Sequence, residues 1–304
     1  MITIYHKSIK EKKLQTLQEE RAGSWLYVVN PSEKEMESLV TKHKLQKEHI
    51  IDALDPHEVP RYETEDGIAY IFTRVPLNRQ RIVTIPVLFI ITKDHTITIS
   101  KEELPFKDQF LRDPAIVTTQ KTKLLLQLFN NTILTYNFLV TGISRKVRAI
   151  SINIESISNK EIVQFVGFES VLNDFLSSLV PTKTILRNIL SGKHIKLYDE
   201  DKDLIEDLEI DSEQLVELCR SNLKNMVNVR EAYSTIMTNN LNRVIKMLTG
   251  LTIILTVPMI IASLYGMNVS LPFSDSPLAF FYIIGFTGII SFFLLGILIR
   301  NRWL

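Results

Sequence analysis

Four consecutive residues, Tyr265-Gly266-Met267-Asn268, place neutral polar groups between two long apolar runs. No charged side chain occurs between Lys246 and Asp275 or in residues 276–299. The carboxamide of Asn268 and the nearby backbone carbonyls can hydrogen-bond the tightly held water shell of a cation such as Mg²⁺. A ring of carboxylates would hold a divalent ion strongly, whereas neutral oxygens permit both capture and release. Neutral oxygens of this kind are therefore able to contact a cation through its water shell.

The two apolar runs are long enough to cross a lipid bilayer. As helices, residues 248–265 cover roughly 27 Å and residues 277–299 somewhat more, against about 30 Å of hydrocarbon. The segment between the runs contains no Lys or Arg, and the basic residues that flank the two runs are Arg243, Lys246, Arg300 and Arg302. By the positive-inside tendency we expect both termini to be cytoplasmic. The alternative is a buried helical hairpin in a soluble protein.

The Gly-Met-Asn triplet after Tyr265, the two-span hairpin at the end of the chain and the basic residues after it resemble the CorA family of divalent-cation channels. The resemblance implies a homopentamer in a prokaryotic plasma or inner membrane. It assigns Tyr265, Gly266, Met267 and Asn268 to the selectivity filter, where Gly266 is expected to adopt backbone angles barred to bulkier residues. It further implies influx of hydrated Mg²⁺, and also of Co²⁺ or Ni²⁺, driven by the membrane potential, with Mg²⁺ as a regulatory ion too.

A stripe of small, hydroxyl and apolar residues precedes the filter at an average spacing of 3.5, which is typical of a left-handed seam facing one axis. Its members are Asn242, Ile245, Leu248, Thr252, Thr256, Met259 and Ser263. Ordinary packing of membrane helices would also use such residues. The resemblance favours pore lining, with Asn242 at the cytoplasmic mouth and Ile245 and Leu248 at an apolar constriction.

Residues 193–249 contain neither Gly nor Pro, so the chain can run from about Asp203 to Tyr265 as one helix. Nine acids occur at its beginning, which suits the positive end of a helix dipole. The alternative is a divalent-ion sensor, in which bound Mg²⁺ holds neighbouring subunits together. The resemblance assigns Asp207 to this regulatory metal site. It places the partner acid in a loop that carries Arg79 and Arg81 here.

The predicted fold class is an α+β membrane protein with an N-terminal cytoplasmic α/β domain. The expected organisation is an α/β domain (1–114), a helical region (115–197), a stalk helix (198–247), a two-span domain (248–299) and a basic tail (300–304). Alternation of β-branched residues predicts strands at Ser24 to Val29, Gly67 to Val75, Ile82 to Thr92 and His95 to Ser100.

Helices are predicted from capping and periodicity. Ser32 with Glu35 forms a capping box that predicts a helix start. Later apolar residues at helical spacing, which include Leu128 and Leu134, predict helical tracts before Gly142, from Ile143 to Ile157, and from about Lys160 to Val180. We expect their apolar stripes to be buried.

Composition excludes several other functions. A net charge of +1 gives no reason to expect nucleic acid as a partner, and one cysteine, Cys219, excludes an intramolecular disulfide. The Ser191-Gly192-Lys193-His194 segment lacks the spacing of a phosphate loop, and no catalytic constellation is evident, so the chain is not expected to be an enzyme. The acids and histidine of Asp52 to Arg61 fit a turn-rich loop or a metal site.

No remaining histidine has a partner at helical ligand spacing, so none is nominated as a ligand. Two rival functions stay open. One is a proton-coupled zinc transporter of the same superfamily, whose signature is usually Gly-Val-Asn or Gly-Ile-Asn, so Met267 argues against it. The other is a membrane-tethered sensor or scaffold that conducts nothing.

Overall fold

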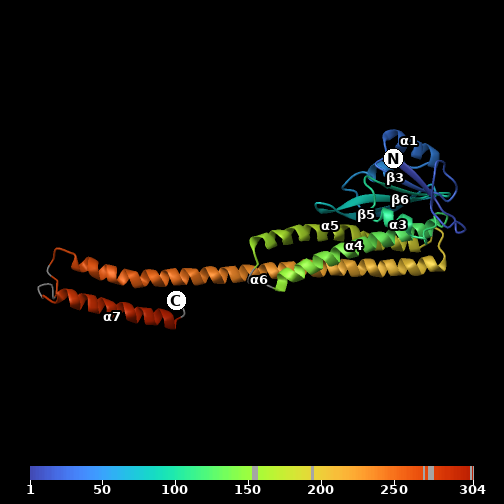
Figure 1. The fold of residues 1–304 in the computed structure, drawn as a ribbon. Coiled ribbons are helices and arrows are strands. Elements are labelled where there is room, and N and C mark those ends of the chain that lie inside the picture. The colour runs from blue at the N-terminus through green and yellow to red at the C-terminus, as the bar shows by residue number, and fades with distance from the viewer. Residues whose placement is uncertain (153–156, 193–194, 270, 273–276, 302, 304) are drawn as a thin grey trace. The chain divides into compact units, whose positions relative to one another are not determined.

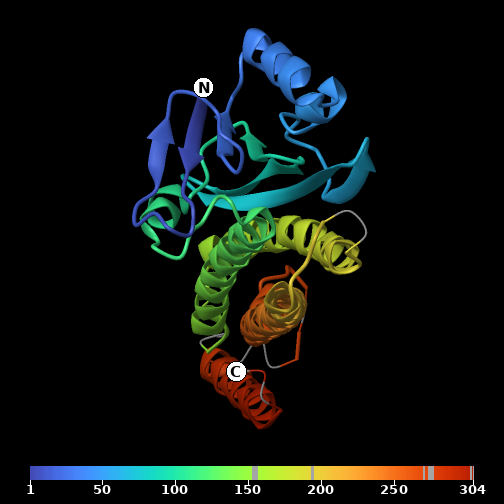
Figure 2. The ribbon, with the colours of Figure 1, turned by 90° about the vertical axis from the view of Figure 1, so that its right-hand side faces the viewer.

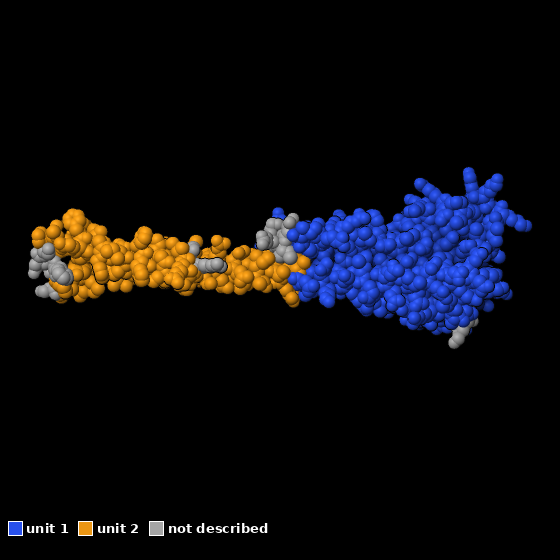
Figure 3. Space-filling model, turned by 90° about the horizontal axis from the view of Figure 1, so that it is seen from below, with its two compact units in different colours: residues 1–228 blue, residues 229–304 orange. Residues whose placement is uncertain are grey.

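The computed structural model describes residues 1–304 except 153–156, 193–194, 270, 273–276, 302 and 304. The chain forms two compact units, residues 1–228 and residues 229–304, coloured separately in Figure 3. One long helix, α6 (Asp199–Tyr265), contributes residues to both units. Each unit is described separately.

The first unit contains a seven-stranded sheet in the order β2-β1-β3-β7-β6-β5-β4. Its strands are β1 (Ile2–His6), β2 (Gln15–Leu17), β3 (Trp25–Val29), β4 (Arg61–Glu65), β5 (Ile68–Asn78), β6 (Ile82–Ile91) and β7 (Thr96–Ser100). Only the β3–β7 pair is parallel, with Trp25 opposite Thr96. The four predicted strands are confirmed within three residues at each end as β3, β5, β6 and β7, whereas β1, β2 and β4 were not predicted.

Helices cover both faces of this sheet, as Figure 2 shows. On one face α1 (Glu33–His43) and α2 (Lys47–Asp52) enclose a core that includes Leu88 and Ile90 of β6. On the other face Phe89 of the same strand packs on Phe129, with ring centroids 5.6 Å apart. Because successive strand residues point to opposite faces, two covered faces explain why β6 reads as one continuous apolar run.

The capping box at the start of α1 is confirmed. Glu35 N donates to Ser32 Oγ at 3.4 Å, and Ser32 N donates to Glu35 Oε2 at 2.8 Å. At the other end of the helix Lys44 adopts the left-handed conformation, with φ of 53°. A short helix, α3 (Lys107–Arg112), follows the sheet.

Two long helices follow, α4 (Lys121–Ile152) and α5 (Asn159–Leu190). The predicted separation of tracts at Gly142 is wrong, because α4 continues through this residue, where an added Cβ would meet nothing within 4 Å. α5 also continues through Pro181 to Leu190. The expected buried stripe is confirmed at Leu128 but not at Leu134, which is 52% exposed.

Within the first unit, α4 and α5 hold the beginning of α6. Asn222 Nδ2 donates to Ser144 Oγ at 2.7 Å, and Ser212 Oγ donates to the Leu179 carbonyl at 3.5 Å. The predicted long helix is confirmed, with its first residue at Asp199. The second unit contains the rest of α6 and α7 (Ala279–Arg300) (Figure 1).

Candidate ion pathway

The second half of α6 and the whole of α7 are long and apolar enough to cross a membrane. Only 6% of the most apolar window of each helix is buried in the chain. A buried hairpin of a soluble protein would hide these side chains, so the structure disfavours that alternative. Exposed apolar surface of this kind instead contacts a bilayer or neighbouring subunits. Of the predicted basic flanks, Arg302 lies outside the described residues.

The filter segment begins where α6 ends, at Tyr265. Gly266 N donates to the Ala262 carbonyl at 3.0 Å, and Met267 N donates to the Leu264 carbonyl at 3.2 Å, so two of the last helical carbonyls are satisfied. Gly266 does not have a positive φ, so the expected special backbone angle is wrong. An added Cβ would lie 3.3 Å from the Ala262 oxygen, a backbone carbonyl of the last turn of α6.

Tyr265 links the end of α6 to the following loop. Its hydroxyl donates to the Pro272 carbonyl at 3.3 Å. Met267 and Asn268 are exposed in the single chain. The carboxamide of Asn268 is therefore accessible at the end of an apolar helix, next to a loop that Tyr265 holds back on the helix end.

The seven stripe residues all lie on α6. Thr252 Oγ1 donates to the Leu248 carbonyl at 2.9 Å, and Thr256 Oγ1 donates to the Thr252 carbonyl at 2.7 Å. Both hydroxyls thereby have their donor satisfied within the helix and keep lone pairs that can accept hydrogen bonds from water. α6 continues through Pro258, which leaves the Ile254 carbonyl without its usual amide partner. The assignment of this stripe to a pore stays a prediction.

The acidic run at the start of α6 divides into two groups. Asp199, Glu200, Glu209 and Glu213 form ion pairs within the chain, for example Glu209 with Arg187 at 2.9 Å, and Asp201 Oδ2 accepts from Tyr198 N at 3.0 Å. The remaining acids are exposed and form no ion pair with any described residue. They are Asp203, Glu206, Asp207 and Asp211.

Asp203, Asp207 and Asp211 are spaced by four residues, so their carboxylates follow one face of the helix. The predicted regulatory residue Asp207 lies in the middle of this face. On the predicted partner loop, Arg79 forms an ion pair with Glu102. Among the described residues, no three His, Cys, Asp or Glu side chains converge around Asp207 within one chain.

Two acids of the Asp52 to Arg61 segment pair with its arginine. The Arg61 guanidinium lies between three carboxylates, with 2.7 Å to Asp52, 2.6 Å to Glu63 and a further contact to Glu58. It also stacks 3.8 Å from the centroid of the Phe72 ring. The loop interpretation of this segment is therefore supported, since the acids neutralise an arginine.

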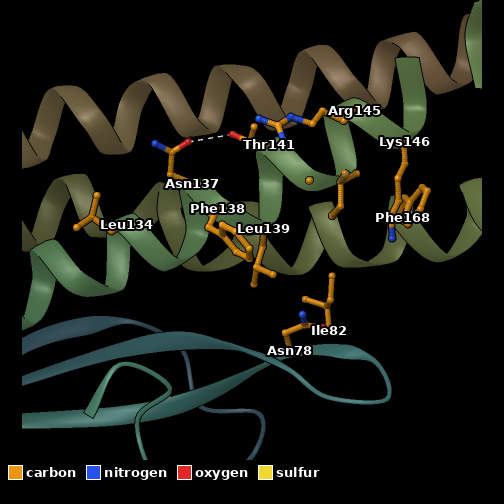
Figure 4. Close-up of a pocket in the computed structure, with 12 residues that line it drawn as sticks. Asn78, Ile82, Leu134, Asn137, Phe138, Leu139, Thr141, Arg145, Lys146 and Phe168 are labelled. Carbon is orange, nitrogen blue, oxygen red and sulfur yellow. Dashed lines mark hydrogen bonds between the residues drawn. The ribbon is translucent and has the colours of Figure 1, made fainter. Parts of the chain in front are cut away.

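A hollow lies between α4, α5 and the hairpin of β5 and β6 (Figure 4). Phe138 and Leu134 line it and are 73% and 52% exposed. Arg145 and Lys146 supply positive charge at its edge, and the described residues that line it include no carboxylate, thiol or imidazole. This lining offers no catalytic group, and its apolar residues are of the type that subunit contacts cover.

One convergence was missed by the sequence analysis. Glu20, His43 and His95 each offer a ligand atom within 4.8 Å of the others. They belong to three separate segments, so no local spacing revealed them.

Comparison with known proteins agrees with this architecture. The family model described as CorA-like Mg²⁺ transporter protein matches residues 20–300. The cobalt/magnesium transport protein CorA of Methanocaldococcus jannaschii is 23% identical over 310 residues, covering 98% of this chain and 96% of that protein.

Solved structures share the fold. The complete CorA magnesium transporter of Methanocaldococcus jannaschii superposes with a TM-score of 0.89 at 21% identity, covering 100% of this chain and 99% of that one. The ZntB cytoplasmic domain of Vibrio parahaemolyticus gives 0.65 at 8% identity, covering 78% of this chain and 98% of that one. Since the family model spans most of the sequence, the chain belongs to the family of CorA-like Mg²⁺ transporter proteins.

Proposed function

We propose that the chain is one subunit of a homopentameric channel that mediates influx of hydrated Mg²⁺, and also admits Co²⁺ and Ni²⁺. The observation that carries the proposal is the exposed Asn268 carboxamide at the end of an apolar helix, in a chain of this family. The proposed filter is Tyr265, Gly266, Met267 and Asn268. The proposed lining of the pore is Asn242, Ile245, Leu248, Thr252, Thr256, Met259 and Ser263.

Several copies are needed to enclose water. Each chain has two spanning helices, and each helix exposes most of its apolar surface. A closed ring around one axis gives every copy the same contacts. We propose five copies, as the family resemblance implies. The exposed Phe138 and Leu134 of the hollow are the surface that an adjacent copy would cover.

Selectivity follows from hydration. Mg²⁺ gives up its water reluctantly and prefers six oxygen ligands in near-ideal geometry. A ring of Asn268 carboxamides would hydrogen-bond the first water shell and leave the ion hydrated. Thr252 and Thr256 would accept hydrogen bonds from the same water further along, because their hydroxyl donors are already used within α6. The proposed lining therefore does not require Mg²⁺ to lose its water shell.

The driving force is the membrane potential. Moving two charges across 100 mV is worth about 4.6 kcal/mol, so influx into a negative interior needs no nucleotide hydrolysis. We propose that both termini are cytoplasmic and that the filter faces outward, in a prokaryotic plasma or inner membrane. The protein is then a transporter rather than an enzyme, and Mg²⁺ is both its cargo and a regulator.

Closure is proposed at Ile245 and Leu248, whose apolar ring would exclude water when narrow. Regulation is proposed at Asp207 together with Asp203 and Asp211. Unpaired carboxylates of adjacent copies repel one another unless a divalent cation lies between them. Bound cytoplasmic Mg²⁺ would therefore hold the ring closed, and its loss would release the subunits.

The test is flux into liposomes that contain the untagged protein, with Mg²⁺, Co²⁺, Ni²⁺ or Zn²⁺ outside. A K⁺ diffusion potential, inside negative, is applied in one series and a pH gradient in another. We expect Mg²⁺ entry driven by the potential, and its loss in Asn268→Ala. The matched control is Asn240→Ala, which removes an exposed carboxamide from α6 at a position off the stripe.

The same experiment separates the alternatives. Zn²⁺ flux that requires the pH gradient would identify a zinc transporter. Absence of flux for every ion, in protein that elutes as a stable oligomer, would identify a sensor or scaffold. Equal Mg²⁺ entry in wild type and Asn268→Ala would refute the assignment of Asn268 to the selectivity filter.

A further inference from the structure

Three side chains that can bind metal converge at one end of the sheet in the first unit. Glu20 precedes β3, His95 directly precedes β7, and His43 ends α1. β3 and β7 are parallel neighbours, so the residues that enter these two strands lie at the same end of the sheet. α1 follows β3 and runs back over it. Its eleven residues cover about 16 Å, nearly the length of the five-residue strand, which returns His43 to that end.

The distances between the three groups are close to those of a metal site. Glu20 Oε2 lies 3.3 Å from His43 Nε2 and 3.9 Å from His95 Nε2. The imidazole rings of His43 and His95 are 5.2 Å apart at an angle of 86°, so they do not stack. Two ligands that are each about 2.1 Å from a tetrahedral ion are about 3.4 Å apart. A small contraction of the observed cluster would therefore enclose an ion.

The cluster is partly buried, and two of its facing polar atoms are unsatisfied. The side chains of His43, Glu20 and His95 are 5%, 12% and 13% exposed. His43 Nε2 and Glu20 Oε2 are both buried and lie 3.3 Å apart, and neither makes a hydrogen bond of standard geometry with a described residue. Buried polar atoms are nearly always paired in folded proteins. An ion between them would satisfy both atoms at once.

The charges around the cluster oppose one another. Burial lowers the pKa of His43, and Glu20 opposes this shift, whereas His95 and Lys42 add to it. Lys42 Nζ lies 2.9 Å from Glu20 Oε1, which leaves Oε2 as the oxygen that faces the histidines.

Backbone contacts hold the two loops in place. Gly23 N donates to the Asp94 carbonyl at 2.7 Å, which ties the loop after Glu20 to the turn before His95. Gly23 has φ of 80°, and an added Cβ would lie 2.7 Å from Thr119 Cγ2, so only glycine fits. His95 N donates to Thr92 Oγ1 at 2.9 Å. The ligands on these loops are thereby preorganised.

The ligand set decides which ions fit. Two imidazoles and one carboxylate suit Zn²⁺, Co²⁺ and Ni²⁺, with at least one position left for water. Mg²⁺ prefers an all-oxygen shell and is not selected by imidazole. We propose that Glu20, His43 and His95 form a transition-metal site that binds Zn²⁺, Co²⁺ or Ni²⁺ and discriminates against Mg²⁺. The bound ion would hold the C-terminal end of α1 against the ends at which β3 and β7 begin.

The test measures metal retained by the untagged full-length protein in detergent, after chelation and reloading with Zn²⁺. A large excess of Mg²⁺ in the buffer occupies the proposed filter and the acidic face of α6, so that their contribution to Zn²⁺ retention is small. We expect one Zn²⁺ per chain under these conditions. Reloading with Co²⁺ should give visible absorption bands of a low-coordinate site with nitrogen ligands.

His43→Asn and Glu20→Gln should each weaken Zn²⁺ binding by about 100-fold or more, since loss of even an outer-shell partner costs 10–100-fold. The matched controls are His57→Asn and Glu19→Gln, which change exposed residues of the same types outside the cluster. Thermal unfolding gives a second measurement: Zn²⁺ should raise the unfolding temperature of wild type and of both controls but not of the two cluster variants.

Three outcomes would overturn the proposal. These are no Zn²⁺ retained by wild type, Zn²⁺ that excess Mg²⁺ displaces, or retention that survives in His43→Asn and Glu20→Gln. Should a cluster variant fail to fold, the Mg²⁺ competition and the Co²⁺ spectrum of the wild-type protein still decide the matter. The transport proposal does not enter any of these measurements, so the two can fail separately.

Discussion

Neutralising Asp207 should weaken closure of the channel by cytoplasmic Mg²⁺. Asp207 is exposed, forms no ion pair with a described residue and lies between Asp203 and Asp211 on one face of α6. A hydrated Mg²⁺ that shares one water with a carboxylate lies about 5 Å from it. In water this attraction is about 1.7 kcal/mol, and screening at physiological salt halves it to about 0.9 kcal/mol.

The loss of 0.9 kcal/mol corresponds to about fivefold in affinity. In a ring of identical subunits the two sides of each interface differ, so an ion between two copies faces the Asp207 carboxylate of one of them. The concentration of cytoplasmic Mg²⁺ that halves the current should then rise about fivefold in Asp207→Asn. The assay is current through inside-out membrane patches, with Mg²⁺ varied on the cytoplasmic face.

Glu213→Gln is the matched control, because Glu213 carries the same charge on α6 but is paired with Lys183 at 3.0 Å. The Mg²⁺ concentration that halves the current through Glu213→Gln should differ from that of wild type by less than about twofold, because exposed ion pairs contribute little free energy. An unchanged value in Asp207→Asn would refute the assignment. Equal shifts in the two variants would show that only overall charge matters, and would refute it as well.

Two further predictions concern the gate and the histidine cluster. Leu248→Asn should leave Mg²⁺ current flowing at cytoplasmic Mg²⁺ that closes the wild type, because a polar ring keeps the constriction wet, whereas Leu248→Met should still close; equal closure in both variants would count against the gate. Burial lowers the pKa of His43 below its usual 6.5, so the unfolded chain binds the proton more tightly and stability should fall as pH drops below about 6.5. In metal-free protein this fall should be smaller in His43→Asn, measured as the unfolding temperature between pH 7 and pH 5; an identical fall in the variant would contradict it.

The sequence predicted those parts of the fold in which one local pattern is sufficient. β5, β6 and β7 are buried on both faces, so they appear as dense runs of β-branched and aromatic residues. The long helix followed from the absence of Gly and Pro in residues 193–249, and the first-turn capping box at Ser32 followed from residue spacing alone. These features depend on neighbours within a few residues.

Elements that depend on partners far along the chain were missed. β4 pairs only with β5 at the edge of the sheet, and Arg61, Glu63 and Glu65 give it the charged composition of an edge strand. Helical tracts were predicted to divide at Gly142 and to end at Val180, but α4 continues through Gly142 and α5 continues to Leu190, where both helices pack on the sheet and on α6. Local propensity predicts a helix end only where tertiary contacts do not oppose it.

The two candidate sites differ in the same way, since one depends on a local pattern and the other on partners far along the chain. Tyr265 to Asn268 is a contiguous signature between two apolar runs, so it was visible without any structure. Glu20, His43 and His95 are separated by 23 and 52 residues, and none of them has a ligand at helical spacing. Their convergence depends on one fact, that β3 pairs in parallel with β7, and only that pairing places the two strand entries side by side. A search for metal sites in a mixed sheet of this kind should therefore compare the residues that precede two neighbouring parallel strands. It should also include the end of the helix that follows the first of these strands.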